Sequence, residues 1–538
     1  MSKMTSVDIV LIAFYDINSL AVLTLHTVLK KQGFNVRSIF FKVRNPNSSM
    51  SMPSDKEINV LVQLVQSLAP KLVGINVKST FFKLAVRITS EIKQKMDTVV
   101  VWGGIHPTVR PAQCIEFADT VCIGEGEGAI VELALKLFEG GDISRIRNLW
   151  VKKREGVFKN DLRPLIEPLD SVPFPDFFPD DKFIIEEGRV SPFMGLEQQE
   201  VYKIMTSRGC FFNCTYCCHS TLRNIYKGKG KSLRRRSVEN VIYELAYAKA
   251  KFKNLRYIDF DDDIFTFDIV WIKKFCEQYK KNINLPFFCY CQPNMVNEEM
   301  IACLKDAGLK LTTIGLQSGS KKIRRYFGRK DSVKEIISAS KLLHKYKIIY
   351  YYHLISDNPL ETDKDKLETL KVLLALPKPF KIKLFLFNFF PETEIVKILL
   401  KKGMISENDI EDQKQKSYSR GIYLLDANVG KKNLPWDTLY YLAGKRYVPK
   451  GVILWMGRSG FLRERIPTLI PLLRLVALDS NAIRTDSKLD LLRFYMLSFL
   501  HNPYLVFKKA VFVLQNMISN RNALLYAKIK VPHYTPRR

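Results

Sequence analysis

The stretch 207-SRGCFFNCTYCCHS-220 gathers four of the ten cysteines of this 538-residue chain, namely Cys210, Cys214, Cys217 and Cys218. The first three follow the spacing Cys-x-x-x-Cys-x-x-Cys. Three thiolates in one loop can each bind one iron of a four-iron, four-sulfur cluster and leave the fourth iron without a protein ligand. A structural zinc site is the main competing explanation, but it usually takes four ligands in two separated pairs. Cys218 adjoins Cys217 and is poorly placed as a further ligand to the same centre, whereas His219 is an alternative ligand.

Strands and helices alternate after this stretch as far as about residue 400. Apolar, β-branched and aromatic runs predict strands, with helical segments between them, at 255–263, 286–294, 309–320, 348–356 and 380–390. Repeated strand–helix units form a barrel or partial barrel, with the chemistry in the loops that follow the strands. We therefore expect residues 196–400 to fold as a partial (β/α) barrel that carries the cysteine loop after its first strand.

A second set of alternating strands and helices occupies the N-terminal part of the chain. Its predicted strands lie at 7–14, 35–41, 71–79 and 98–104. This order implies a parallel sheet with helices on both faces and a ligand site beyond the carboxyl ends of the strands. The predicted fold class is therefore α/β. Its expected parts are a Rossmann-like domain at 1–140, a Pro- and aromatic-rich linker at 141–195, the barrel at 196–400 and a mostly helical, basic region at 401–538.

The cysteine spacing, with the aromatic Tyr216 before the last cysteine, resembles the signature of the radical S-adenosylmethionine (SAM) superfamily. The resemblance implies a 4Fe–4S cluster bound by Cys210, Cys214 and Cys217, with SAM on the open iron and Tyr216 among the cofactor-binding residues. In that superfamily an electron from the cluster cleaves SAM to methionine and a 5′-deoxyadenosyl radical.

The same resemblance supplies further SAM-binding candidates. In 260-FDDDIF-265 it makes Asp262, and next Asp263, the partner of the SAM amino group, while a solvated acidic turn is the alternative. The stretch 314-IGLQSGS-320 resembles an IGxESGS motif, so Gln317 and Ser318 would contact the SAM ribose or carboxylate. Arg329 would pair with the SAM carboxylate, with a surface arginine as the alternative.

Two other stretches belong to the pattern of the superfamily. The loop 356-SDNPLET-362 resembles a GxPGET loop but departs from it at Asp357 and Asn358. The stretch 123-IGEGEGAI-130 contains Glu125 and Glu127, for which we expect roles in a turn and in helix capping.

The first 140 residues resemble the cobalamin-binding-type domain of one large subfamily, which includes class B methyltransferases and the anaerobic Mg-protoporphyrin cyclase. Gly103 and Gly104 end a strand, where glycine lets the backbone approach a bulky flat cofactor, and Ser79 would provide a middle contact. The stretch 16-DINSLA-21 has Asn18 where methionine-synthase-type domains have their cobalt-binding histidine, so the lower cobalt ligand should not be histidine. A Rossmann-like domain that no longer binds cobalamin is the alternative.

Together these cofactors imply a cobalamin-dependent radical SAM methyltransferase that acts on an unactivated carbon. In such enzymes the radical abstracts hydrogen, methylcobalamin delivers the methyl group and a second SAM remethylates the cobalt. A radical SAM oxidoreductase or cyclase of the same architecture is the alternative. A zinc-bearing, basic nucleic-acid-binding protein is a more distant one, but the chain has no recognised nucleic-acid-binding motif, so no nucleic-acid partner is expected.

The formal net charge of +30 is compatible with an anionic membrane surface or anionic partners. Apolar runs in the C-terminal region are broken by Arg, Lys or Pro before they reach the ~20 residues that a membrane-spanning helix needs. A basic helical cap and peripheral membrane contact both explain this region. We expect a cytoplasmic protein, peripheral at the inner face of the membrane, with a hydrophobic or lipid-like small substrate and an external electron donor.

Overall fold

The computed structural model describes residues 7–43, 52–195, 200–416, 433–446 and 448–460. These residues fall into two compact units. The first unit holds those within Met1–Gly315, Arg324–Ile349 and Asn388–Arg420, and the second holds those within Leu316–Ile323, Tyr350–Phe387 and Gly421–Arg538. The segment predicted as a barrel is therefore divided between the two units.

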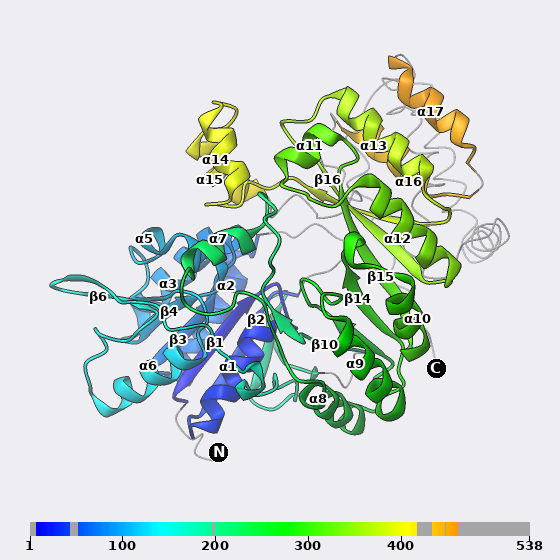
Figure 1. Ribbon diagram of the computed structural model, residues 1–538. Helices are drawn as coiled ribbons and strands as arrows, with labels where there is room; N and C mark the ends of the chain where they lie inside the picture. The colour runs from blue at the N-terminus through cyan, green and yellow to red at the C-terminus, as the bar shows by residue number, and fades with distance from the viewer. Residues whose placement is uncertain (1–6, 44–51, 196–199, 417–432, 447, 461–538) are drawn as a thin grey trace, which may run out of the picture. The chain divides into compact units, whose positions relative to one another are not determined.

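A nine-stranded sheet forms the N-terminal part of the first unit (Figure 1). Its strand order is β7-β6-β5-β4-β3-β1-β2-β8-β9. The bounds are β1 (Ile9–Phe14), β2 (Val36–Phe41), β3 (Leu72–Asn76), β4 (Val99–Gly103), β5 (Thr120–Cys122), β6 (Leu149–Lys153), β7 (Gly156–Lys159), β8 (Lys182–Glu186) and β9 (Arg189–Pro192). Strands β1 to β5 and β8 pair in parallel, whereas β6, β7 and β9 are antiparallel to their neighbours.

Helices cover both faces of this sheet (Figure 1). On one face α1 (Leu20–Lys31) packs against α6 (Glu127–Glu139), and on the other α2 (Asp55–Leu68) packs against α3 (Phe82–Lys95). The short helices α4 (Ile105–Val109) and α5 (Pro111–Cys114) lie between β4 and β5 along the chain. Helix α2 begins with a capping box between Ser54 and Glu57, which satisfies backbone N–H groups that the first turn leaves free. The predicted parallel sheet wound on both faces is confirmed.

The segment 141–195 differs from the linker that its composition predicts. It supplies β6, β7, β8 and β9, two antiparallel hairpins at the two edges of the sheet. Every residue of β7 and β9 is exposed, so these strands lack the alternation of apolar and polar residues by which a strand is recognised in a sequence. Backbone hydrogen bonds to neighbouring strands hold them in the sheet.

Four parallel strands follow in the first unit, namely β10 (Val201–Ile204), β13 (Tyr257–Phe260), β14 (Phe287–Cys291) and β15 (Leu309–Gln317), whose last two residues belong to the second unit. Helices alternate with them along the chain, namely α7 (Cys218–Ile225), α8 (Val238–Lys251), α9 (Ile269–Asn282), α10 (Glu298–Ala307), α11 (Lys321–Tyr326) and α12 (Val333–Lys345). A small antiparallel ribbon joins β11 (Ser207–Arg208) to β12 (Arg234–Arg235). Phe260, Phe275 and Phe287 pack edge to face in the core beneath these strands. Helices α14 (Glu394–Lys401) and α15 (Glu407–Lys416) complete the described part of the unit.

The second unit contains the parallel strands β16 (Ile349–Ser356) and β17 (Lys381–Leu386). Helices α13 (Asp363–Ala375), α16 (Leu434–Ala443) and α17 (Lys450–Arg458) pack against one another beside them. Trp436 Nε1 donates to Asp363 Oδ1 at 3.0 Å and so ties α16 to the start of α13. The succession of strands and helices through both units agrees with the predicted partial barrel.

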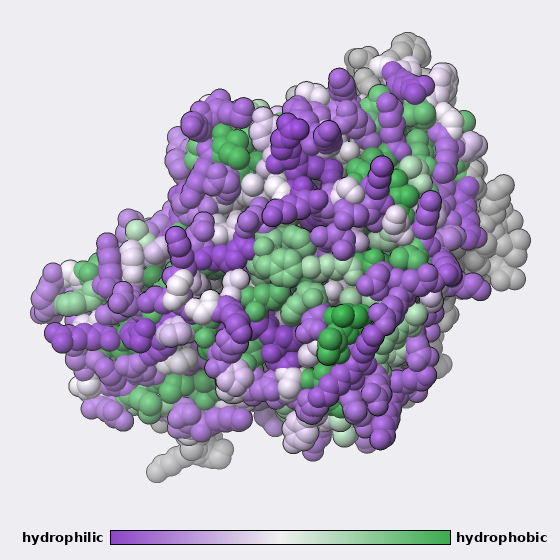
Figure 2. Space-filling model, viewed as in Figure 1, coloured by the Kyte–Doolittle hydropathy of each residue, from purple (hydrophilic) through white to green (hydrophobic). Residues whose placement is uncertain are grey.

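The C-terminal region is described only in part. Its described elements after residue 401 are helical, as predicted. The membrane-contact prediction rests on the stretches 451–478 and 491–514, of which only residues 451–460 are described. Within the described ranges, no helix combines the length and the apolar content required to cross a membrane. On the face drawn in Figure 2, hydrophilic side chains cover much of the described surface and apolar patches interrupt them.

Candidate functional site

The cysteine loop begins at the carboxyl end of β10 and is held there by Asp262, which follows β13. The Asp262 side chain is buried, and its residue is 1% exposed. Its Oδ2 accepts from the Thr206 backbone N–H at 3.2 Å, and its Oδ1 accepts from Thr206 Oγ1 at 2.9 Å and from Ser207 Oγ. Burial raises the pKa of Asp262, while these donors and Arg235 oppose that rise. The carboxylate predicted to meet the SAM amino group thus anchors the residues that enter the loop.

The three predicted cluster ligands lie in this loop. Cys210 and Cys214 are buried and Cys217 is half-buried. Gly209, with φ of +93°, makes the turn into the loop, and a Cβ there would lie 1.8 Å from the Ser232 carbonyl oxygen, so only glycine fits.

The surroundings of the three sulfurs differ. Burial raises the pKa of Cys210 to about 12, although the Phe212 N–H donates to its Sγ at 3.4 Å. The pKa of Cys217 is lowered to about 6, chiefly because the Cys218 thiol donates to it. A metal deprotonates the thiols that bind it, so buried, closely spaced cysteines fit a cluster held by thiolates.

A second group of donors overlaps the loop. In the parts of the chain that the structure describes, Cys217, Cys218 and His219 place their donor atoms within 4.8 Å of one another. Such a group suits a single ion, but it provides only three ligands, and His219 Nε2 already lies 2.8 Å from Asp263 Oδ1. The ligands of a 4Fe–4S cluster each bind a different iron and need not converge on one point. Cys210, Cys214 and Cys217 therefore remain the better set.

Tyr216 and Arg329 lie beside the cysteine loop. The Tyr216 ring packs edge-on against Phe327, with ring centroids 4.9 Å apart. Arg329 pairs through Nε with Asp331 Oδ1 at 2.8 Å, donates from Nη2 to the Gly315 carbonyl at 2.8 Å, and places Nη1 4.0 Å from Cys214 Sγ. Arg329 is therefore a buried cation beside the loop, not the surface arginine that was the alternative.

Gln317 and Ser318 lie in the second unit. Ser318 Oγ contacts Glu361 Oε1 at 3.3 Å and Thr369 Oγ1 at 3.2 Å, and burial raises the pKa of Glu361 to about 7. Among the described residues, neither Gln317 Oε1 nor Asn358 Nδ2 has a hydrogen-bond partner, although both atoms are buried. Buried polar groups in proteins are nearly always paired, so these two atoms suit a bound polar ligand.

The carboxyl edge of the first sheet carries the residues predicted to meet cobalamin. Gly103 ends β4, and Gly104 has φ of +102°; a Cβ there would lie 2.4 Å from Asn76 Oδ1. Ser79 is buried and its hydroxyl lies 3.0 Å from His106 Nδ1, so it helps to hold α4, the helix that contains His106, in place.

A cavity of about 370 Å³ opens at this edge. Its lining is mostly apolar and contains several glycines, and it includes Leu11, Leu20, Gly74, Gly103, Gly104, Cys122, Gly124, Gly126, Ile130 and Phe174. A glycine-lined, largely apolar cavity at the carboxyl ends of parallel strands fits part of a large flat cofactor. The residues present therefore fit cobalamin at this edge.

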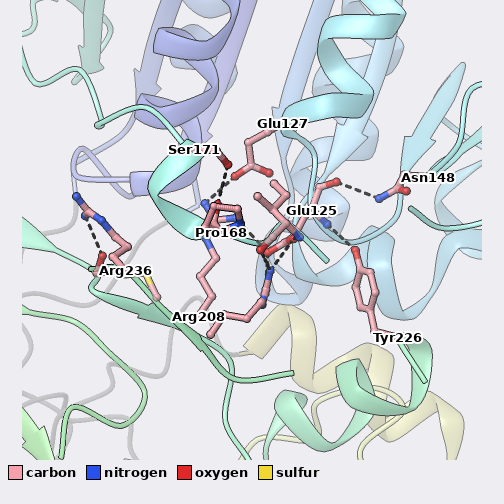
Figure 3. Close-up of polar contacts among 11 residues, drawn as sticks. Glu125, Glu127, Asn148, Pro168, Ser171, Arg208, Tyr226 and Arg236 are labelled. Carbon is pink, nitrogen blue, oxygen red and sulfur yellow. Dashed lines mark hydrogen bonds and ion pairs between the residues drawn. The ribbon is translucent and has the colours of Figure 1, made fainter. Parts of the chain in front are cut away.

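Two acidic residues of the glycine-rich turn have roles that the sequence did not reveal. Helix α6 begins at Glu127, and its N-cap, Gly126, provides no side-chain cap. Glu125 and Glu127 instead bind arginines. Both contact Arg208 (Figure 3), and Glu125 also contacts Arg234. Glu125 lies in the turn, as expected, but its carboxylate does not cap the helix and instead accepts hydrogen bonds from the ribbon that flanks the cysteine loop.

Two protein-family models match the chain. Residues 7–134 match the B12 binding domain and residues 204–373 match the radical SAM superfamily. The chain therefore joins a B12-binding domain to a radical SAM domain, an arrangement that implies cobalamin, SAM and a 4Fe–4S cluster.

Relatives and solved structures agree with this arrangement. The chain is 28% identical over 330 residues to an uncharacterized methyltransferase of Pyrococcus horikoshii, covering 60% of this chain and 67% of that protein. It is 24% identical over 278 residues to the bacteriochlorophyllide d C-12(1)-methyltransferase of Chlorobaculum tepidum, covering 49% of this chain and only 52% of that protein.

Among solved structures, the cobalamin-dependent SAM radical enzyme OxsB aligns with a TM-score of 0.61 at 17% identity over 96% of this chain and 84% of that one. The radical SAM methyltransferase TsrM of Kitasatospora setae aligns with a TM-score of 0.58 at 19% identity over 74% of this chain and 75% of that one. These likenesses show that the fold is shared.

Proposed function

We propose that this chain, a radical SAM enzyme with a B12-binding domain, is a cobalamin-dependent methyltransferase that methylates an unactivated carbon. The observation that carries the proposal lies within the first unit, where Arg208, two residues before the loop of Cys210, Cys214 and Cys217, is hydrogen-bonded to Glu125 in the turn that lines the glycine-rich cavity. The names of the relatives in Pyrococcus horikoshii and Chlorobaculum tepidum support methyl transfer.

The bound groups would supply the radical and the methyl donor. The overall reaction consumes one substrate C–H bond, two molecules of SAM and two electrons, and it yields the methylated product, S-adenosylhomocysteine, methionine and 5′-deoxyadenosine. An external one-electron donor provides the electrons.

The chain's own residues bind and position these groups. Cys210, Cys214 and Cys217 hold the cluster, and the buried Arg329 stabilises negative charge on it. Gly103 and Gly104 let the backbone approach cobalamin closely. Burial of this machinery keeps water away from a reactive radical.

The SAM contacts are part of the same proposal. Tyr216 and Gln317 are candidates, and the buried, unpartnered Gln317 Oε1 supports Gln317. Asp262, Asp263, Ser318 and Arg329 are candidates whose groups already have partners within the chain. Isothermal titration calorimetry with SAM, on reconstituted variants in which each candidate is replaced by alanine, tests each contact. A residue whose variant binds SAM as tightly as the parent does not contact SAM.

An oxidoreductase or cyclase is the second candidate, because OxsB, which aligns over 96% of the chain, is described as a radical enzyme. Anaerobic reconstitution with iron, sulfide and hydroxocobalamin, followed by product counting with dithionite and SAM, separates the two. S-adenosylhomocysteine formed together with 5′-deoxyadenosine supports methyl transfer. Formation of 5′-deoxyadenosine alone, in a protein that contains cobalamin, contradicts it.

We also propose a hydrophobic substrate and peripheral contact with the inner face of the cytoplasmic membrane. The support is the sequence of the stretches 451–478 and 491–514, in which basic residues or proline interrupt apolar runs. Partition of the full chain onto anionic vesicles should fall as salt rises. If the full chain binds neither anionic nor neutral vesicles at any salt concentration, the proposed membrane contact is wrong.

A further inference from the structure

The turn between β5 and α6 receives hydrogen bonds from the residues that precede the cysteine loop (Figure 3). Arg208, two residues before Cys210, donates from Nη1 to Glu125 Oε1 at 3.1 Å and from Nη2 to Glu127 Oε1 at 2.6 Å. Arg234, opposite Arg208 in the β11–β12 ribbon, donates to Glu125 Oε1 at 2.9 Å and to Glu125 Oε2 at 3.1 Å. The two guanidinium groups of the ribbon therefore converge on one carboxylate.

The residues that follow the loop are held at the same turn. Tyr226 comes directly after α7, the helix that begins at Cys218. The Glu125 backbone N–H donates to Tyr226 Oη at 2.8 Å (Figure 3). Gly124 has φ of +80°, and a Cβ there would lie 1.7 Å from Tyr226 Oη, so the turn and the tyrosine are in close contact. The loop is thus anchored to one turn both before Cys210 and after Cys217.

The anchoring groups are largely withdrawn from water. The side chains of Arg234, Glu127 and Glu125 are 4%, 14% and 15% exposed, and that of Arg208 is 29% exposed. Although burial opposes ionisation of Glu125, the hydrogen bonds from Arg234 and the charge of Arg208 lower its pKa. Two-pronged arginine–carboxylate pairs have a fixed geometry, and a buried ion pair contributes little net stability after desolvation. Such a network is therefore better suited to fixing a geometry than to stabilising the fold.

The turn is also part of the cavity wall, because Gly124, Glu125, Gly126 and Glu127 all line the cavity. A shift of the cysteine loop on this turn is therefore a shift relative to the cavity. Reactions between bound groups are sensitive to such shifts, since a misplacement of about 1 Å can cost about 10²-fold in rate.

We propose that Glu125 and Glu127 are positioning residues that, through Arg208 and Arg234, fix the cysteine loop at one distance from the glycine-lined cavity. The inference rests on the proposed function, because this distance governs chemistry only when a cluster occupies the loop and cobalamin occupies the cavity. Both glutamates line the cavity, and their positioning role runs through the two arginines.

The test uses the full chain, reconstituted anaerobically with iron, sulfide and hydroxocobalamin, and reduced until both the cluster and cob(II)alamin are paramagnetic. Pulsed EPR then measures the distribution of cluster-to-cobalt distances. Because a preorganised site is held within about 0.5 Å, loss of both glutamate pairs in Arg208→Gln should widen this distribution at least about twofold. Glu127→Gln weakens only the Arg208–Glu127 pair, so it should widen the distribution by a smaller factor. Hydrogen exchange of amides 206–212 in the cofactor-free chain should also rise about tenfold, as expected for loss of a charge-assisted hydrogen bond.

Two comparisons separate positioning from general destabilisation. Arg87→Gln removes an exposed arginine that pairs with Asp55 at 2.9 Å and Glu91 at 3.0 Å in the same unit, and it should leave both readouts unchanged. In a chain that already carries Glu125→Gln and Glu127→Gln, adding Arg208→Gln should change neither readout further.

If the parent binds both groups and both single variants keep its distance distribution, the positioning role is overturned while the proposed function stands. If Arg208→Gln fails to fold, Glu127→Gln carries the test, because it leaves the Arg208–Glu125 and Arg234–Glu125 bonds in place. If the parent itself binds no cobalamin, the proposed function fails and this inference fails with it.

Discussion

Replacing Asp262 with asparagine should loosen the entrance to the cysteine loop before any cofactor binds. The carboxylate accepts three hydrogen bonds from Thr206 and Ser207, and no water reaches it, because the residue is 1% exposed. Asparagine keeps the shape and one acceptor oxygen but turns the other position into a donor. If the amide nitrogen takes the Oδ2 position, the Thr206 N–H loses its acceptor; if it takes the Oδ1 position, the Thr206 and Ser207 hydroxyls both lose theirs, so at least one donor is left without an acceptor.

The size of the effect follows from that count. A buried donor left unsatisfied costs about 1–3 kcal/mol. At 1.4 kcal/mol for each factor of ten, local opening around Thr206 becomes roughly 5- to 150-fold more frequent. Asp262→Ala removes all three bonds and should cost about 3 kcal/mol or more.

Hydrogen exchange of peptides that contain Thr206, in the cofactor-free chain, measures this opening. Iron content after reconstitution should fall in parallel. Asp263→Asn is the matched control, since the neighbouring carboxylate contacts His219 instead and should leave Thr206 protected. The reasoning is refuted if Asp262→Asn protects Thr206 as the parent does while its KM for SAM rises, because the carboxylate would then serve SAM and not the strand.

Three further predictions concern the cluster, cobalamin and pH. Cys214→Ala should abolish reductive cleavage of SAM, measured as 5′-deoxyadenosine; cleavage at the parent rate would contradict the cluster assignment. Gly104→Ala should lower cobalamin occupancy, measured by absorbance, because the new Cβ would lie 2.4 Å from Asn76 Oδ1 and alanine at φ of +102° adds about 1–3 kcal/mol of strain. Full occupancy would show that the strain at this position does not affect cobalamin binding. Burial raises the pKa of Glu361 to about 7 from an ordinary value of 4.5, so the unfolded chain releases this proton as pH rises between those values while the folded chain keeps it. The free energy of unfolding therefore falls over that pH range, by at most about 3 kcal/mol. The Tm of Glu361→Gln should equal that of the parent near pH 4.5 and should exceed it above about pH 7. Equal differences in Tm at both ends would rule this out.

The parts of the fold that depend on local pattern were predictable. Buried strands such as β1 and β4 are runs of apolar residues. The start of α2 is marked by a capping-box pattern, with Ser54 three residues before Glu57. Strands β7 and β9 were missed because all their residues face solvent and only backbone pairing defines them.

The same division applies to the site. The sequence by itself determined the chemistry, because the spacing of Cys210, Cys214 and Cys217 and the glycine pair at the end of β4 are local features that need no knowledge of distant residues. Only the tertiary structure decided what holds these features together. Glu125 meets Arg208 across 83 positions of the chain, and Asp262 meets Thr206 across 56. A carboxylate in a sequence carries no sign of which distant donor will reach it, since that depends on how the strands pack and which side chains they bury together.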